Sequence, residues 1–261
     1  MKSEISQHFR SPDTFVVVIV LTLVALISVS GFIAPHSNET APVVALDSAL
    51  DEFMRSNTKE YSQFNEELLI RYFFQDKHDG VFVDIGCAWP VRNSTTCYLE
   101  RHLNWTGIAV DAIARHDEAW ARERPKSKFL NYAVSDQSGG TITFYEASWS
   151  GVSSLSEEHA TRFTGQKPKP IEVDAITLND LLDNNDIESF SFLSLDIEGA
   201  EMLALAGLDI ERFGPRLVCV EGRGRENSNI VLDHFVKHGY ELVDEYKPYD
   251  HINYYFRKRD N

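Results

Sequence analysis

The sequence predicts an α/β fold, in which a mostly parallel sheet carries helices on both faces in the doubly wound arrangement. The main observation is that short apolar runs of strand length, such as 81–84 and 107–111, alternate with segments of helical periodicity. The last two strand-like runs are separated only by residues 245–251, which is too short for a helical crossover. We therefore expect an antiparallel hairpin at the C-terminal end of an otherwise parallel sheet.

The N-terminal segment differs in kind from this pattern. Residues 15–34 carry no charged side chain and are rich in Val, Ile and Leu. A helix of this length covers about 30 Å, the hydrocarbon thickness of a bilayer. We therefore predict one transmembrane helix at 15–34 as an N-terminal anchor, preceded by a cytoplasmic tail at 1–14. A cleaved signal peptide is the alternative, although the apolar run is long for one.

Few charges decide on which side of the membrane the main domain lies. Lys2 and Arg10 precede the apolar run, and the next Lys or Arg is Arg55. The positive-inside rule then puts the N-terminus in the cytoplasm and the domain across the membrane. Because Glu4 and Asp13 offset part of this positive charge, the opposite orientation stays open.

The remaining elements follow from periodicity and from turn residues. We expect a stalk at 35–60 that ends in a short helix, and then the main domain at 61–261, which starts with an amphipathic helix at 61–75. Further helices are predicted at 96–103, in the segment between the strand 107–111 and residue 120, in a short segment that begins at 177, and at 229–238. Strands are predicted at 81–84, 107–111, 128–134, 191–196, 216–221, 240–244 and 252–257, with a hairpin-like stretch at 141–145.

Residues 146–170 show no clear periodicity. A loop of this length is either functional, for example as a lid over a substrate, or disordered. Trp149 and Phe163 favour the lid, because large aromatic side chains are unusual in disordered sequence.

The net charge and the cysteines restrict the class of protein. A formal charge of −15 argues against nucleic-acid binding, because neutralising phosphates takes clustered Lys and Arg. Cys87, Cys97 and Cys219 form no CxxC pair and no His spacing suited to zinc, so we expect buried thiols. Small molecules or glycans are the expected partners.

Acidic residues recur at the points where the predicted strands end. In open α/β sheets, ligands bind at the carboxyl ends of the strands. The acids at these ends are Asp84, Asp111, Asp136, Asp196, Glu198 and Glu221. Any one of them is unremarkable, since a strand often stops where the chain reaches solvent, but the series predicts a binding site along this edge.

The stretch VFVDIGCAWP at 81–90 indicates what binds there. Gly86 allows a ligand to approach the backbone, but Ala88 and Pro90 stand where a bound pyrophosphate requires further glycines. Asp84 would repel a phosphate and attract a cation. Asp111, 25 residues after Gly86, stands where an acid accepts hydrogen bonds from ribose hydroxyls. An adenosine group with a cationic tail and no phosphate is S-adenosylmethionine, and the missing glycines disfavour an NAD-dependent oxidoreductase.

Five stretches, taken in order, carry a family resemblance. They are SQFNEELLIRYFF (62–74), VFVDIGCAWP (81–90), WTGIAVDAI (105–113), NYAVSD (131–136) and FLSLDIEGAEMLALAGLD (192–209). The last is the most specific, because it contains Asp-x-Glu-Gly-x-Glu followed by a helix ending in Ala-Gly. With these motifs the chain resembles the FkbM-type methyltransferase family over residues 60–257. The resemblance implies an S-adenosylmethionine-dependent enzyme with a Rossmann-like class I methyltransferase fold.

The resemblance also implies roles for single residues. It assigns Asp84, Gly86 and Ala88 to the methionine end of the cofactor, Asp111 to the ribose, and Ala133, Val134 and Asp136 to the border of the adenine. It assigns Asp196, Glu198 and Glu201 to the neighbourhood of the sulfonium and the acceptor. The sequence departs from the family pattern at Asn65, where relatives tend to have Gly, and at 87–90, where the loop is usually richer in Gly and Asn.

We therefore expect a membrane-anchored O-methyltransferase that acts on a hydroxyl of a sugar, glycan or secondary metabolite. Such a reaction needs a base, and Asp196 or Glu198 is the candidate. No dedicated metal site is predicted, but magnesium bound by these acids is an alternative, because carboxylates suit that ion. Structural roles also stay open: Asp196 as an acceptor in its turn, and Glu201 and Glu221 as helix-start and strand-end charges.

A function of another class stays open. A membrane-tethered binding or trafficking protein could keep the methyltransferase fold without catalysis. The altered loop at 87–90 favours this alternative. The supply of cofactor favours it too, because S-adenosylmethionine is made in the cytosol and the domain is expected across the membrane.

Overall fold

The structure, a computed structural model, describes residues 48–222 and 225–260. The predicted tail at 1–14, the anchor at 15–34 and the first part of the stalk lie outside these residues. Within the described ranges, no helix is long and apolar enough to cross a membrane. All the described residues belong to one compact unit of the chain.

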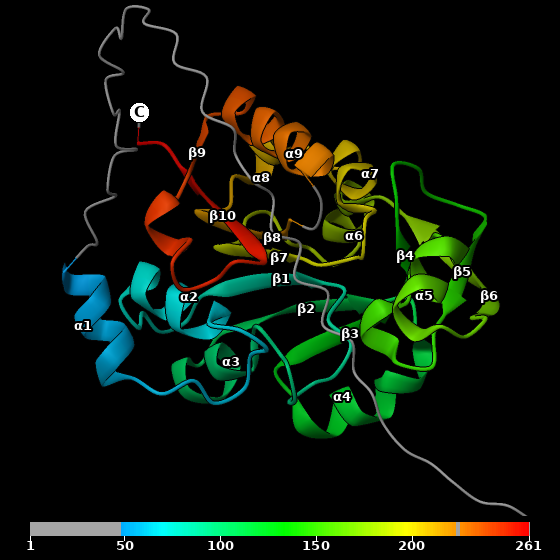
Figure 1. Ribbon diagram of the computed structural model, residues 1–261, viewed down its shortest axis with the longest axis horizontal. Coiled ribbons are helices and arrows are strands. Elements are labelled where there is room, and N and C mark those ends of the chain that lie inside the picture. Colours follow the sequence, from blue (N-terminus) through cyan, green and yellow to red (C-terminus); the bar gives the residue numbers. More distant parts are fainter. Residues whose placement is uncertain (1–47, 223–224, 261) are drawn as a thin grey trace, which may run out of the picture. The chain divides into compact units, whose positions relative to one another are not determined.

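A seven-stranded mixed sheet forms the centre of this unit, in the order β3-β2-β1-β7-β8-β10-β9 (Figure 1). Its strands are β1 (Val81–Ile85), β2 (Thr106–Asp111), β3 (Ser127–Asn131), β7 (Phe192–Leu195), β8 (Leu217–Glu221), β9 (Tyr240–Leu242) and β10 (Asn253–Lys258). The first five in this list are parallel, whereas β10 is antiparallel to both β8 and β9. This is a class I methyltransferase-like sheet, and the predicted C-terminal antiparallel hairpin is confirmed.

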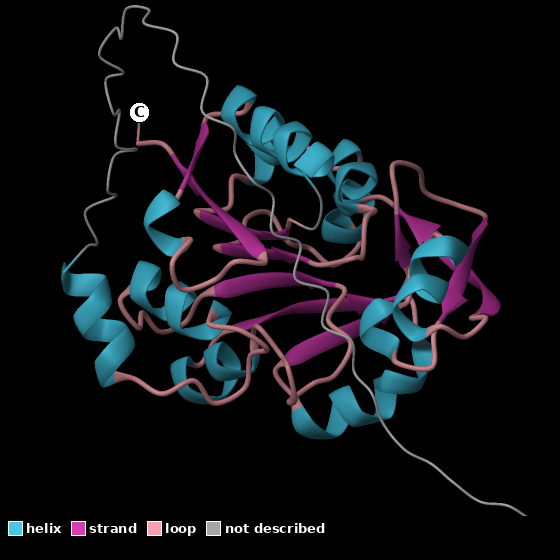
Figure 2. Cartoon of the chain, viewed as in Figure 1, coloured by secondary structure: helices cyan, strands magenta, loops and turns pink. Residues whose placement is uncertain are grey.

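Helices cover both faces of the sheet, as Figures 1 and 2 show. One face carries α6 (Leu178–Asp183), α7 (Glu201–Ala206), α8 (Ile210–Phe213) and α9 (Arg225–Lys237); the other carries α2 (Glu66–Phe74), α3 (Cys97–Leu103) and α4 (Asp117–Glu123), with α1 (Ser48–Ser56) against α2. Alternation along β1 explains the two layers. Val83 and Ile85 join the core under the first group of helices, together with Leu205, whereas Phe82 joins the core under the second, together with Leu99.

A smaller sheet, β4-β6-β5, follows β3 in the chain. Its strands are β4 (Ala133–Val134), β5 (Thr141–Glu146) and β6 (Lys169–Ile176). The single strand predicted at 128–134 was wrong, because the chain leaves the large sheet at Tyr132: β3 pairs with β2, and β4 pairs with β6. Strand β6 was missed because it contains Pro170 and charged residues on its exposed side.

The remaining segments correct two further predictions. The helix predicted at 61–75 begins only at Glu66. Residues 146–170 are folded, and they contain η2 (Ser150–Val152) and α5 (Glu157–Thr164). Two other short 3-10 turns, η1 (Ala114–His116) and η3 (Asp244–Tyr246), lie elsewhere in the chain. Ser156 caps α5 by accepting the backbone N–H of His159 at 3.2 Å. These helices are too short for periodicity alone to reveal them.

Candidate active site

A pocket opens at the carboxyl ends of β1, β2 and β7, the edge at which the sequence predicted a binding site. Of the predicted residues, its lining includes Gly86, Ala88, Asp111, Ala133, Val134, Asp196 and Glu198. The other three, Asp84, Asp136 and Glu201, lie outside the lining. From β1 the chain continues to β2 and β3 on one side of the sheet, and it then returns to β7 and β8 on the other side. Open α/β sheets bind their ligands at such a switch point.

Gly86 lies where the loop after β1 approaches the end of β7 most closely. Its φ is +84°, a left-handed conformation that favours glycine. A Cβ at this position would lie 1.7 Å from the carbonyl oxygen of Asp196. The backbone N–H of Gly86 donates to the carbonyl of Val110 at 2.9 Å, which ties the same loop to β2. Position 86 therefore accepts no side chain, and the pocket keeps bare backbone at this wall.

Asp111 holds the tip of β2 to the loop after β1. Its two carboxylate oxygens accept the backbone N–H of Ala88 at 2.9 Å and that of Ile113 at 2.8 Å. Burial raises the pKa of Asp111 to about 6, although the two hydrogen bonds act in the opposite direction. Each carboxylate oxygen has a second lone pair, so the side chain can still accept a hydrogen bond from a ligand.

Asp84, near the end of β1, supports the loop that follows this strand. Its side chain is 4% exposed and accepts a hydrogen bond from the Thr96 hydroxyl at 2.7 Å. Burial raises the pKa of Asp84, and the Thr96 hydroxyl and the nearby Arg124 limit the rise. The structure thus gives Asp84 a supporting position, and its contact with the methionine end of a cofactor stays a prediction.

Arg124 is the centre of a buried network that sequence reasoning missed. Its guanidinium is fully buried and donates to the Glu100 carboxylate at 2.8 Å. It also donates to the backbone carbonyls of Pro90 at 3.0 Å and Thr96 at 3.1 Å. The residue thereby clamps both ends of the segment that leads from the pocket loop into α3. Its sequence context, the end of a charged helix, gave no signal of this role.

The opposite end of the pocket is mostly apolar. Ala133 and Val134 line it together with Ala112, Ile113, Tyr132 and Phe144. Asp136, predicted at the same border, is instead exposed, and it accepts a hydrogen bond from the Ser135 hydroxyl at 3.1 Å. A flat, uncharged ring system is the kind of group that this end can hold.

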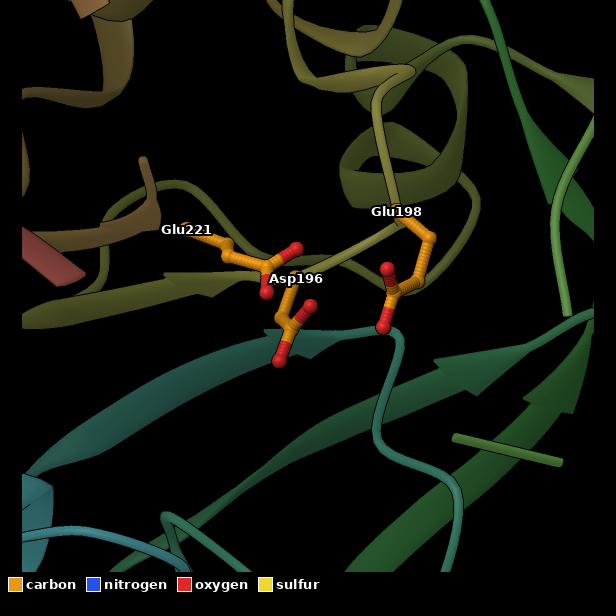
Figure 3. A group of neighbouring side chains, drawn as sticks. All are labelled: Asp196, Glu198 and Glu221. Atoms are coloured by element: carbon orange, nitrogen blue, oxygen red, sulfur yellow. The ribbon is translucent and has the colours of Figure 1, made fainter. Parts of the chain in front are cut away.

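Three carboxylates converge above the end of β1, as Figure 3 shows. One oxygen each from Asp196, Glu198 and Glu221 lie within 4.8 Å of one another, close enough to hold a metal ion, although acidic groups often cluster without one. The pKa of Asp196 is raised well above its usual range by loss of solvent and by the like charges of Glu221 and Glu198. Because the side chain of Asp196 keeps exposed surface, we attribute the raised pKa mainly to the like charges and less to loss of solvent.

Two further glutamates, Glu221 and Glu201, lie near this cluster and have different environments. Glu221 lies at the end of β8, as predicted for the acids at strand ends, and the structure adds that it is buried beside Asp196. Glu201 was predicted near the acceptor, yet its Oε1 accepts the backbone N–H groups of Ile197 at 3.2 Å and Gly199 at 3.0 Å. At the start of α7 it fixes the loop that carries Glu198, which agrees with the structural alternative.

Residues 147–164, here called the covering segment, form one wall of the pocket. Ser150, Gly151, Ser153 and Leu155 belong to the lining. Trp149 stacks on Trp89 of the loop after β1, with ring centroids 6.3 Å apart and an interplanar angle of 23°. The segment is thus packed against the loop after β1. Its opening and closing, which a lid requires, stay a prediction.

His159, on α5 of the covering segment, reaches the carboxylate cluster. Its Nε2 lies 2.7 Å from Oε2 of Glu198. The side chain of Glu198 is 6% exposed, and that of His159 is 24% exposed. No sequence signal pointed to this histidine, because it lies in a segment without assigned structure, far along the chain from Glu198.

The sequence matches the family profile of the methyltransferase FkbM domain over residues 77–246, more than half of the chain. No curated protein matches it. Two solved structures are similar: a TehB-like SAM-dependent methyltransferase from Corynebacterium glutamicum (14% identity, 81% of this chain and 95% of that one, TM-score 0.40), and a SAM-dependent methyltransferase from Geobacter sulfurreducens in complex with S-adenosyl-L-homocysteine (10% identity, 79% of each chain, TM-score 0.35).

Proposed function

The chain belongs to the FkbM methyltransferase family, and on that premise we propose that it methylates a hydroxyl of a sugar, glycan or secondary metabolite. Family membership makes it a methyltransferase with S-adenosylmethionine as methyl donor. The hydroxyl acceptor is the proposal. The observation that supports it is the presence of two carboxylates, Asp196 and Glu198, in the wall of the pocket.

The residues of the pocket fit the cofactor. When bound, S-adenosylmethionine supplies an electrophilic methyl group. We assign the ribose hydroxyls to Asp111, whose fixed oxygens retain lone pairs, and the adenine to the apolar end at Ala133 and Val134. Gly86 leaves bare backbone where the ligand approaches. The loop after β1 lacks the glycine amides that a phosphate would need.

Asp196 is our candidate for the general base. A hydroxyl attacks a methyl group more readily when a base takes its proton, and positioned bases contribute about 10²- to 10⁴-fold. A base works best when its pKa lies closer to the operating pH, and the pKa of Asp196 is raised. We assign the hydroxyl proton to the carboxylate of Asp196, with Glu198 and Glu221 as neighbours that keep this carboxylate basic.

A divalent cation is the alternative to a carboxylate base. Carboxylates and water are the ligands that magnesium prefers, and Asp196, Glu198 and Glu221 lie close enough to share one ion. A chelator separates the two mechanisms, because it removes activity only if a bound cation takes part.

The N-terminal anchor at 15–34 and the domain across the membrane stay part of the proposal. They rest on the apolar sequence and on Lys2 and Arg10. A reporter fused to the C-terminus, read for the side of the membrane that it faces, tests the orientation. A cytosolic reporter would contradict the proposed orientation and remove the problem of cofactor supply.

The proposed activity has a direct test. The full-length chain in detergent is titrated by calorimetry with S-adenosylmethionine and, separately, with NAD; we expect binding of the first alone. Methyl transfer from labelled S-adenosylmethionine is then measured on a panel of free sugars, glycans and phenolic metabolites. Cofactor binding without any transfer to hydroxyl compounds would contradict the acceptor class, and no cofactor binding by a folded protein would favour the non-catalytic alternative.

A further inference from the structure

Glu198 is held in place by the covering segment at two points. The Ser154 hydroxyl donates to the backbone carbonyl of Glu198 at 2.9 Å. The imidazole of His159 binds Oε2 of the same residue at 2.7 Å. Both the backbone and the carboxylate of residue 198 therefore depend on a segment that is about forty residues away in the chain.

The backbone of Glu198 needs such support. Its φ is +53°, a left-handed conformation that costs free energy in a residue with a side chain. Conformations of this kind persist only where the surrounding structure holds them, and they cluster at functional sites. Around Glu198 this support comes from Ser154 and from Glu201, which binds the N–H of the next residue, Gly199.

The position of His159 is itself well defined. Its backbone N–H donates to the cap residue Ser156, and its ring lies against Phe163, with centroids 4.9 Å apart. The imidazole thus projects from a fixed point of α5 toward Glu198. The same segment supplies Ser150 and Ser153 to the lining, so the wall of the pocket and the orientation of the Glu198 carboxylate are set by one structural unit.

We propose that His159 is a positioning residue for methyl transfer. It donates a ring N–H to Oε2 of Glu198 and fixes this carboxylate in the pocket, within reach of Asp196 and of the acceptor hydroxyl. The inference rests on the proposed function. Hydrogen bonds of this kind matter for rate because an error of about 1 Å in the position of a reacting or orienting group can cost on the order of 10²-fold.

The kinetic test compares two variants at His159 and one control variant, all in the full-length chain. In His159→Ala we expect kcat to fall on the order of 10- to 100-fold, with an unchanged KM for S-adenosylmethionine, because the cofactor residues are untouched. In His159→Gln the amide nitrogen replaces the ring donor, and kcat should recover to within about fivefold of the wild type. Equal activity of His159→Ala and wild type would overturn the inference.

The matched control is His238→Ala. His238 also binds a glutamate, with Nδ1 3.1 Å from Oε1 of Glu211, and its side chain is 26% exposed. This pair links the residue after α9 to α8, outside the pocket lining. The two histidines are similarly exposed, whereas Glu211 is 72% exposed and Glu198 is 6% exposed, so the control removes a His–Glu contact at the surface and should keep wild-type kcat. A loss in His238→Ala as large as that in His159→Ala would also overturn the inference.

A second measurement needs no acceptor. The ring N–H signals of His159 are recorded by NMR at one pH in the wild type and in Glu198→Ala. A ring N–H that donates to Oε2 of Glu198 exchanges slowly with water and gives a signal, and this signal should be lost in Glu198→Ala. No signal in the wild type, or an equal signal in both proteins, would overturn the inference and leave the proposed function standing. A wild type that shows the signal but has no transferase activity would instead overturn the proposed function alone.

Discussion

The carbonyl oxygen of Asp196 occupies the space that a side chain on Gly86 would need: a Cβ at Gly86 lies 1.7 Å from it. The loop after β1 and the end of β7 therefore touch backbone to backbone. This contact brings the loop after β1 and the proposed base to the same point of the pocket. It exists because β1 and β7 are adjacent parallel strands that end together.

Gly86→Ala should impair cofactor binding. The added methyl group meets Asp196 backbone, which cannot rotate away, and it also meets an unfavourable φ of +84°. We expect the affinity for S-adenosylmethionine to fall at least tenfold, equivalent to about 1.4 kcal/mol, as measured by calorimetry. Gly239→Ala is the control, because its φ is +80° and no atom lies within 4 Å of its Cβ. It shares the backbone strain of about 1 kcal/mol but should bind cofactor normally.

Asp111→Ala should abolish cofactor binding and leave the fold intact. The carboxylate is the proposed acceptor for the ribose hydroxyls. Its ionised form is disfavoured in the folded protein, because burial raises its pKa to about 6. The substitution removes two backbone hydrogen bonds together with this buried charge, so the two effects offset each other and the melting temperature at pH 7 should change little. Calorimetry and circular dichroism measure the two effects, and unchanged affinity would refute the assigned site.

The affinity of the wild type for S-adenosylmethionine should depend on pH through Asp111. A carboxylate accepts the ribose hydroxyls when ionised, and the pKa is raised from 3.8 to about 6. The affinity should therefore be highest well above pH 6 and decrease as the pH falls through about 6. Titrations between pH 5 and pH 8 measure it. A constant affinity over this range would mean that ligand binding does not depend on the ionisation of Asp111.

Arg124→Ala should destabilise the domain strongly. It leaves the buried carboxylate of Glu100 without its cation, and breaking a buried pair costs about 3–5 kcal/mol. For a domain of this size the melting temperature should fall by about 10 °C. Arg101→Ala is the control, because its ion pair with Glu123 is about one-third exposed, and such pairs contribute less than about 1 kcal/mol. Similar losses in both variants would argue against the clamp.

Asp196→Asn should lower kcat by about 10²- to 10⁴-fold, the usual contribution of a general base. The wild-type rate should rise with pH through the raised pKa of Asp196, because only the ionised form accepts a proton. The exposed Asp174 on β6 supplies the control, and Asp174→Asn should be fully active. A pH-independent rate in the wild type would contradict the role of Asp196.

A chelator separates the base from the metal alternative. With a carboxylate base, EDTA should leave the rate unchanged. Loss of activity in EDTA, restored by magnesium, would assign Asp196, Glu198 and Glu221 to a cation and would remove Asp196 from the role of base.

The local signals in the sequence located most of the sheet. Strands β1, β2, β7, β8, β9 and β10 lie where apolar runs were found, because a buried strand shows its burial in a few consecutive residues. Strand β6 carries charged residues on its exposed side and was missed. The break at Tyr132 was missed as well, since no local pattern says that neighbouring residues pair with different sheets.

In the candidate site, too, some residues were found from the sequence and others only from the structure. Gly86, Asp111 and Asp196 were identified from the sequence, because ligands meet open α/β sheets at strand ends and the strands were visible. Arg124, His159 and the burial of Glu221 appeared only in the structure.

The sequence by itself therefore determined the parallel part of the sheet, the C-terminal hairpin, the edge that carries the pocket and the family. These depend on periodicity and on short motifs, which are local properties of the chain. Only the tertiary structure decided which acids share the pocket: it put Glu198 beside Asp196 and His159, and it left Asp84, Asp136 and Glu201 outside the lining. The physical reason is that contacts between distant residues depend on how helices and loops pack, and packing is not encoded in any single stretch.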